Sequence, residues 1–174
     1  VIGGIGSFTP SRVVIDGDGL FHLANYLASG KIIPGQDVIL TPHFGEASRL
    51  LGVPSDEIKQ NRPAGARELA RRTGAVALLK GPASIASNGD RIAINTSGNP
   101  ALATAGSGDV LAGVIASLLV KGVAPLDAAA SGAFLHGLAA DLFARESGLE
   151  SMKATDLIDF LRDAISEIME GCGR

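Results

Sequence analysis

Residues 99–113 read NPALATAGSGDVLAG, a glycine-rich turn that opens directly into an apolar helix predicted to continue to Val120. Gly106 and Gly108 let the backbone approach a ligand closely and turn its N–H groups toward one point. The unpaired amides of a helix start, together with the positive end of the helix dipole, form a site for an anion. A transferring phosphoryl group needs such a site, because its charge spreads over the equatorial oxygens. This stretch therefore predicts a phosphate site at the start of a helix.

Asp109, directly after this turn, has two interpretations from the residues alone. An acidic residue in the first turn of a helix complements the helix dipole, and this is the commoner role. A carboxylate beside an anion site can also act as a general base that takes a proton from an attacking hydroxyl. The adjacency of Gly106-Ser107-Gly108 to Asp109 favours the catalytic role. The chain matches neither G-x-x-x-x-G-K-[ST] nor G-x-G-x-x-G, so P-loop and Rossmann assignments are poor.

Outward from this turn, the first half of the chain alternates short strand-like runs with helical ones. We expect strands over residues 12–16, 37–41, 75–80, 84–87 and 91–95, and helices over residues 20–28, 46–51, 55–72, 109–120, 125–145 and 154–169. Pro63 and Gly65 predict a break or restart in the third of these helices, and Asn88-Gly89 predicts a hairpin. Strands that feed helices indicate an α/β fold, with a mostly parallel sheet covered by helices on both faces and a late hairpin. Residues 1–174 are expected to form one domain.

The composition is that of a globular chain rich in glycine. Its 174 residues are 46 % hydrophobic and 19 % charged, which excludes a disordered chain and suffices for one domain. The 23 glycines are about 13 % of the chain, against roughly 7 % on average. A formal net charge of −3 gives no electrostatic case for a nucleic-acid or membrane partner. The single cysteine, Cys172, cannot form an internal disulfide, and we expect a reduced, cytoplasmic protein.

Four motifs in order resemble those of the ADP/ATP-dependent NAD(P)H-hydrate dehydratases, members of the ribokinase-like superfamily. They are VIDGDGL at residues 14–20, ILTPHFGE at 39–46, LKGPAS at 79–84 and the stretch 99–113. The similarity is to the C-terminal domain of the bifunctional NAD(P)H-hydrate repair enzymes, or to its stand-alone form. It implies a ribokinase-like fold, in which the incoming nucleotide phosphorylates the ring hydroxyl of NAD(P)H hydrate and phosphate is then eliminated.

The resemblance also implies roles for individual residues. Asp109 would contact the hydrate and act as the catalytic base, with Gly6 and His43 beside the same substrate. The anion hole would be formed by Gly106, Ser107 and Gly108. The adenine-nucleotide site would be lined by Lys80, Gly81, Pro82, Ala83, Ser84 and Gly108. Glu46 would help to hold Mg²⁺ through water, and ADP or ATP would be the phosphoryl donor.

Several of these residues also have plain structural interpretations. His43 could bond the backbone of the turn after Thr41-Pro42, and Lys80 at a strand end could be a solvated charge. His136 and His22 are better explained as structural histidines than as ligands. Asp16 and Asp18 are expected to cap the helix that follows them.

The beginning of the chain departs from the family pattern. Its I-G-x-G-L-G segment is shortened to residues 2–6, and we expect the N-terminal part of the family domain to be missing. Three alternatives follow. The chain is a fragment of a larger enzyme, a complete but shortened protein that forms a homo-oligomer, or a non-catalytic adenine-nucleotide-binding module. Among enzymes, the alternative is a ribokinase-like kinase of a small alcohol such as a vitamin precursor.

Overall fold

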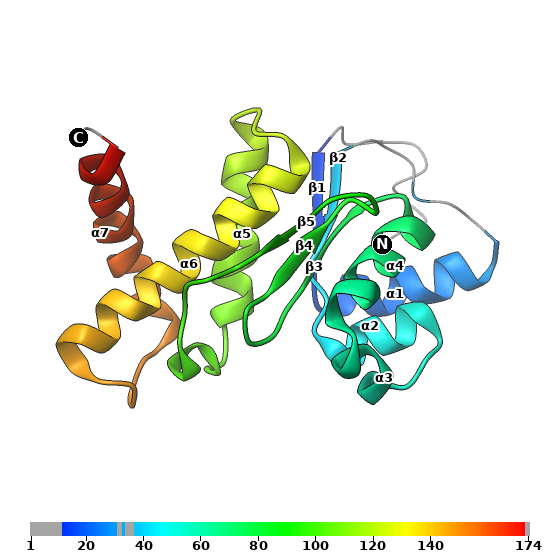
Figure 1. Ribbon diagram of the computed structural model, residues 1–174, viewed down its shortest axis with the longest axis horizontal. Coiled ribbons are helices and arrows are strands. Elements are labelled where there is room, and N and C mark those ends of the chain that lie inside the picture. The colour runs from blue at the N-terminus through cyan, green and yellow to red at the C-terminus, as the bar shows by residue number, and fades with distance from the viewer. Residues whose placement is uncertain (1–11, 31–32, 34–36, 173–174) are drawn as a thin grey trace.

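The computed structural model describes residues 12–30, 33 and 37–172, and this part of the chain forms a five-stranded sheet with helices on both faces (Figure 1). The strands lie in chain order and are β1 (Arg12–Ile15), β2 (Asp37–Leu40), β3 (Val76–Leu79), β4 (Ile85–Ser87) and β5 (Ile92–Ile94). The first three strands pair in parallel, whereas β4 pairs antiparallel with both β3 and β5. Only β4 therefore runs against the others, which confirms the mostly parallel sheet and the late hairpin.

The helices also follow the sequence pattern, with small shifts at their ends. They are α1 (Asp18–Ala28), α2 (Phe44–Leu51), α3 (Ser55–Gln60), α4 (Arg62–Thr73), α5 (Ser107–Val120), α6 (Pro125–Ser147) and α7 (Ala154–Cys172), with a 3₁₀ turn over Pro100–Leu102.

The expected break or restart is found between α3 and α4, two residues before Pro63. The chain breaks at Asn61, whose side-chain oxygen accepts a hydrogen bond from the Ala64 amide at 3.2 Å and so caps α4. Pro63 lies in the first turn of α4, where its missing N–H removes no helical hydrogen bond. Gly65 is buried inside α4, where an added Cβ would lie 2.8 Å from Ile58 Cγ2. Both residues therefore start or pack a helix rather than end one.

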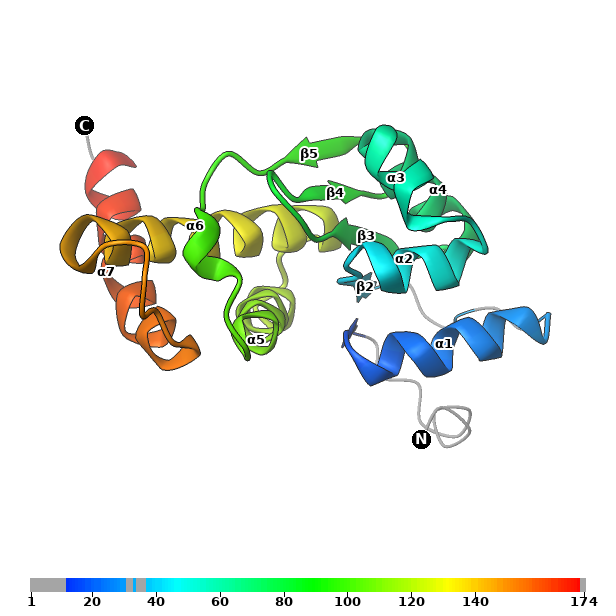
Figure 2. The ribbon, with the colours of Figure 1, turned by 90° about the horizontal axis from the view of Figure 1, so that it is seen from below.

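Alternate residues of the central strands fill two separate cores. Ile39 and Leu78 pack with apolar side chains of α5 and α6 on one face. Leu40 packs under α1, and Leu79 packs under α2, α3 and α4 on the other face. Figure 2 shows these two helical layers on opposite sides of the strands. All four side chains are inaccessible to solvent, and burial of each contributes about 1.5–3 kcal/mol.

Helix α7 packs on α6 rather than on the sheet, at the end of the molecule opposite α1–α4 (Figures 1 and 2). Its inner face contributes Leu157 and Ala164 to a third core with residues of α6. A second stripe of α7 exposes Ile158, Ile165 and Met169, and the last two line a groove beside β5 and α6. Among the described residues, no helix is long and apolar enough to span a membrane.

Candidate functional site

The candidate site lies where the parallel strands β1, β2 and β3 end. Because these strands are parallel, their carboxyl ends meet at one edge of the sheet, the usual place for ligands in α/β folds. Backbone hydrogen bonds continue past the strands and join the next segments. The Thr41 amide donates to the Ile15 carbonyl at 3.1 Å, and the Lys80 amide donates to the Pro42 carbonyl at 2.8 Å. The turns that carry the predicted site residues are therefore held side by side.

The glycine turn places the start of α5 against this edge. Gly106 is the N-cap with a φ of +84°, a left-handed conformation that glycine adopts without strain, and it offers no side chain to cap the first-turn amides. A Cβ added to Gly108 would lie 3.5 Å from Asp16 Oδ2 and 3.6 Å from Lys80 Nζ. Asp109 is exposed in the first turn. The start of α5 and the Lys80 ammonium thus lie close together at Gly108, as an anion site requires, with the Asp16 carboxylate beside them.

Asp16 and Lys80 form an ion pair beside Gly108. Lys80 Nζ donates to Asp16 Oδ1 at 2.7 Å, and the two side chains are only 22 % and 17 % exposed. The prediction that Asp16 and Asp18 cap α1 is wrong, because Gly17 is the N-cap and no side chain caps it. Lys80 is likewise not a freely solvated charge. The Asp16 carboxylate fixes the ammonium close to the start of α5.

His136 contacts the first residue of the anion site from the protein interior. It lies on α6, is buried, and its Nε2 lies 3.0 Å from the Ser107 carbonyl oxygen and 3.2 Å from Ser107 Oγ. Burial lowers the pKa of His136 to about 4, and the hydrogen bond to Ser107 only partly opposes this shift. The ring is therefore neutral at pH 7. Its structural role was predicted, and the structure adds that its partner is the first residue of α5.

His43 and Glu46 form the start of α2. His43 Nδ1 accepts from the amides of Gly45 at 3.0 Å and Glu46 at 3.2 Å, while Glu46 Oε2 accepts from the His43 amide at 2.8 Å. This reciprocal capping box is the backbone role that the sequence left open for His43. The imidazole is still 61 % exposed, with Nε2 lying 3.5 Å from Glu46 Oε1. A cap and a ligand contact are therefore compatible in one side chain.

The predicted nucleotide loop, residues 80–84, is tightly wound. Gly81 has a φ of +154°, and a Cβ there would lie 2.9 Å from the Phe44 ring. Ser84 Oγ donates to the Gly81 carbonyl at 3.1 Å, and Ser84 Oγ also accepts from the Gly81 amide at 3.3 Å. Ala83 has a φ of +49°, which is unusual for a residue with a side chain. Such a strained, tightly bonded turn is typical of a ligand-binding loop.

The structure brings most of the predicted site residues to one edge of the sheet. Gly108 faces Lys80, and the turn of His43 and Glu46 is joined to Lys80 through Pro42. Gly6, predicted beside the substrate, lies outside the described residues. A separate apolar groove of about 610 Å³ runs between β5, α6 and α7, and of the predicted site residues it includes Ser84 alone.

Sequence reasoning missed two residues that act on this site. Asp16 was assigned to a helix cap, although its place directly after a strand that ends at the site could have indicated its contact with Lys80. Arg62 carries no local signal, because its partner Ala83 is 21 residues away.

Comparison with known proteins places the chain among dehydratases of hydrated nicotinamide cofactors. A family model described as NAD(P)H-hydrate dehydratase matches residues 6–163. The bifunctional NAD(P)H-hydrate repair enzyme of Moorella thermoacetica is 44 % identical over 160 residues, 90 % of this chain and 30 % of that protein. The ADP-dependent (S)-NAD(P)H-hydrate dehydratase of Neisseria meningitidis is 43 % identical over 143 residues, 81 % of this chain and 48 % of that protein. The chain thus spans 30 % and 48 % of the length of these two curated relatives.

A solved structure agrees with the sequence relatives. The ADP/ATP-dependent NAD(P)H-hydrate dehydratase from Bacillus subtilis was co-crystallised with ATP and Mg²⁺ and soaked with CoA. It superposes with a TM-score of 0.79 at 32 % identity, over 90 % of this chain and 56 % of that one. The predicted ribokinase-like fold is confirmed.

Proposed function

This chain belongs to the NAD(P)H-hydrate dehydratase family, and we propose that it uses ADP or ATP to convert NAD(P)H hydrate back to NAD(P)H. One observation carries the proposal. Asp109 stands exposed in the first turn of α5, directly after a glycine turn whose Gly108 faces the Lys80 ammonium. This arrangement supplies a base next to Gly108, an anion site at the helix start and a fixed cation that faces Gly108.

The chemistry needs phosphorylation because hydroxide is a poor leaving group. Asp109 accepts the proton of the ring hydroxyl while the hydroxyl oxygen attacks the terminal phosphorus of the nucleotide. The bond from that phosphorus to the bridging oxygen breaks, and AMP or ADP departs with the electron pair. The amides of residues 106–108 stabilise the charge on the transferring group. The ring nitrogen then expels orthophosphate, a neighbouring ring carbon loses a proton, and the double bond re-forms.

The remaining site residues hold the two substrates. We assign Lys80, Gly81, Pro82, Ala83, Ser84 and Gly108 to the adenine nucleotide, and Gly6, His43 and Asp109 to the hydrate. The assignment of the two substrates to two loops is supported by the closeness of residues 42–46 to residues 80–84. The Lys80–Pro42 hydrogen bond holds these two loops together.

Magnesium is the expected companion of the nucleotide. Among the described residues there is no cluster of three metal-ligating side chains. Mg²⁺ is commonly held by one or two carboxylates, water and substrate phosphates. Glu46 would contact the ion through water, and the ion would neutralise phosphate charge. We also propose that the reaction takes place in the cytoplasm, as the single cysteine leads us to expect.

The proposal is tested by separating binding from turnover in the Asp109→Asn variant. The amide is isosteric but cannot accept the hydroxyl proton. We expect calorimetric titration to give the same dissociation constant for ADP or ATP, within about threefold, in the wild type and the variant. Loss of nucleotide binding in the variant would mean that Asp109 maintains the nucleotide site rather than acting as the base.

A further inference from the structure

Arg62, the first residue of α4, holds the nucleotide loop from outside. Its Nη2 donates to the Ala83 carbonyl at 2.7 Å. Ala83 is one of two non-glycine residues with a positive φ in the described part of the chain. A strained turn persists only where its surroundings fix it, and this hydrogen bond is such a restraint. The guanidinium thus acts on the backbone conformation of residues 80–84.

The same guanidinium is also linked, through the Phe44 ring, to the turn that carries His43 and Glu46. Its central carbon lies 5.7 Å from the centre of the Phe44 ring, and that ring packs against Gly81. Phe44 follows His43 and begins α2, the helix whose capping box contains Glu46. Arg62 and Phe44 therefore form a second link between the two loops, besides the Lys80–Pro42 hydrogen bond.

The charge of Arg62 is uncompensated in the described structure. No carboxylate among the described residues forms an ion pair with it, in contrast to Lys80, which is paired with Asp16. Its Nε is buried and has no hydrogen-bond partner. A buried unpaired donor is costly and calls for an explanation beyond folding. A retained positive charge beside the loop favours a ligand that carries phosphates.

We propose that Arg62 is a positioning residue for the nucleotide: it fixes residues 80–84 in the binding conformation and adds positive charge next to them. This inference rests on the proposed function, because it takes residues 80–84 to be the nucleotide loop. Arg62 acts through the Ala83 carbonyl and the Phe44 ring, so its loss should weaken nucleotide binding and leave the chemical step intact.

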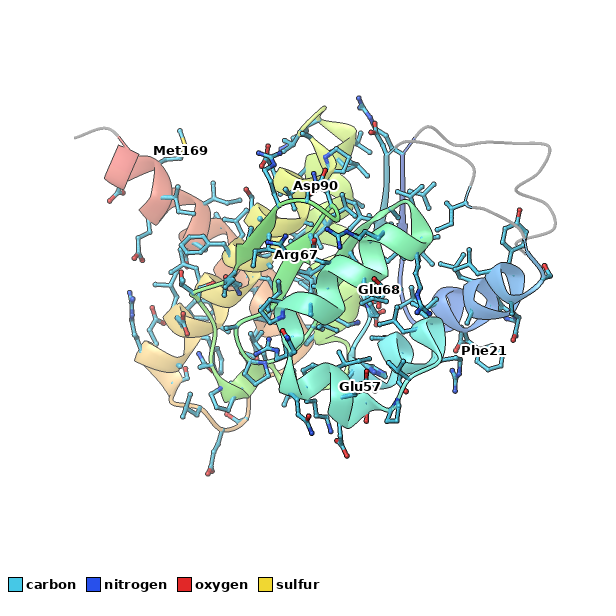
Figure 3. All side chains as sticks on the ribbon, turned by 45° about the vertical axis from the view of Figure 1, so that its right-hand side comes forward. Phe21, Glu57, Arg67, Glu68, Asp90 and Met169 are labelled. Atoms are coloured by element: carbon cyan, nitrogen blue, oxygen red, sulfur yellow. The ribbon has the colours of Figure 1, made fainter. Side chains whose placement is uncertain are left out.

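The test compares Arg62→Ala with Arg67→Ala. Arg67 lies on the same helix and also donates to a loop carbonyl, that of Asp90 at 2.9 Å, but at the hairpin turn away from the site. Figure 3 shows Arg67 beside Asp90. Loss of a hydrogen bond from a charged group should raise the ADP dissociation constant of Arg62→Ala roughly 10- to 100-fold in calorimetric titration. Arg67→Ala should bind ADP as the wild type does.

Two further measurements separate positioning from general damage to the fold. At saturating nucleotide, kcat of Arg62→Ala should match the wild type while KM for nucleotide rises, and millimolar guanidinium should restore ADP affinity. Arg62→Lys should rescue only partly, because an ammonium cannot both donate to Ala83 and stack on Phe44. Equal ADP binding by wild type and Arg62→Ala, or equal losses in both alanine variants, would overturn the inference. Failure of the wild type to bind any adenine nucleotide would instead overturn the proposed function.

Discussion

His136 shows how a single buried side chain prepares the candidate site. Its neutral ring lies 3.0 Å from the Ser107 carbonyl, so the first residue of α5 is fixed from the protein interior. Asp16 does the same for Lys80 from the neighbouring strand end. The residues proposed to meet substrate are therefore held by partners that never need to touch it. Such prior alignment is what makes amides and charges effective at a transferring phosphoryl group.

The lowered pKa of His136 predicts that stability falls as the solution becomes acidic. In the unfolded chain a histidine has a pKa near 6.5, whereas in the folded protein the pKa of His136 is about 4. Between these values the unfolded state binds more protons, so acid favours it. The free energy of unfolding should thus be fully retained above pH 6.5 and fall by up to about 3 kcal/mol toward pH 4.

Urea unfolding of the wild type and His136→Asn at several pH values checks this expectation. Other groups also titrate in this range, so the informative quantity is the difference between the two proteins. The variant should lose part of the pH dependence found for the wild type. Parallel pH profiles would show that His136 is protonated as easily in the folded protein as in the unfolded chain.

At the scale of elements, glycines set how closely α6 approaches its neighbours. Gly132 lies against Ile115 of α5, where an added Cβ would be 2.6 Å from Ile115 Cγ1. Gly137 lies against the backbone of Ser97, in the segment that leads to the glycine turn. Ser97 Oγ also donates to the Phe134 carbonyl at 2.8 Å. The close approach of α6 thus positions the segment before α5 as well as α5 itself.

Gly137→Ala should therefore destabilise the protein, whereas Gly113→Ala should stabilise it. A Cβ at position 137 would lie 2.7 Å from the Ser97 carbonyl carbon, and relief of such a contact requires backbone shifts that cost about 1–3 kcal/mol. Gly113 is a helical residue of α5 with no atom within 4 Å of its would-be Cβ. Alanine there should raise the free energy of unfolding by about 0.5–1 kcal/mol. Urea unfolding measures both, and similar effects at the two positions would contradict this packing.

Elements were easier to predict from the sequence than the contacts between them. The strands, the Asn88-Gly89 hairpin and the helix over residues 109–120 carry local signals. The hairpin is confirmed, the strands agree to within one residue at each end, and the helix begins two residues earlier, at Ser107. Pro63 indicated a break or restart, and the structure shows the restart, because a proline fits the first turn of a helix. Asp16 and Arg62 were missed because their partners lie 64 and 21 residues away. The motifs gave the candidate site, and only the fold supplied the residues that hold it.

Over the whole molecule, the two sheet edges and one side of α7 are open for association among the described residues. Within this part of the chain β1 pairs only with β2 and β5 only with β4, so each has an edge without a strand partner. Helix α7 exposes Ile158, Ile165 and Met169, the last at 68 % exposure and visible at the end of the helix in Figure 3. An open strand edge and exposed apolar side chains favour self-association.

We propose that the protein is a homo-oligomer that covers one of these surfaces. Light scattering after gel filtration should give a mass of at least twice the 17.6 kDa of the chain. Met169→Lys with Ile165→Lys should shift the mass toward the monomer if α7 forms the interface. A monomer mass for the wild type at tens of micromolar would refute the proposal.

The central claim, that the chain repairs hydrated nicotinamide cofactors through Asp109, is tested most directly by its turnover of NADH hydrate. The wild type should restore the absorbance of NADH with ADP or ATP and Mg²⁺, releasing one orthophosphate per NADH. Asp109→Asn should be slower by about 10²–10⁴-fold, the usual contribution of a general base. Nucleotide binding without NADH recovery would identify a non-catalytic binding module, and stable phosphorylation of a hydroxymethyl compound would identify a small-alcohol kinase. Either result would contradict the account.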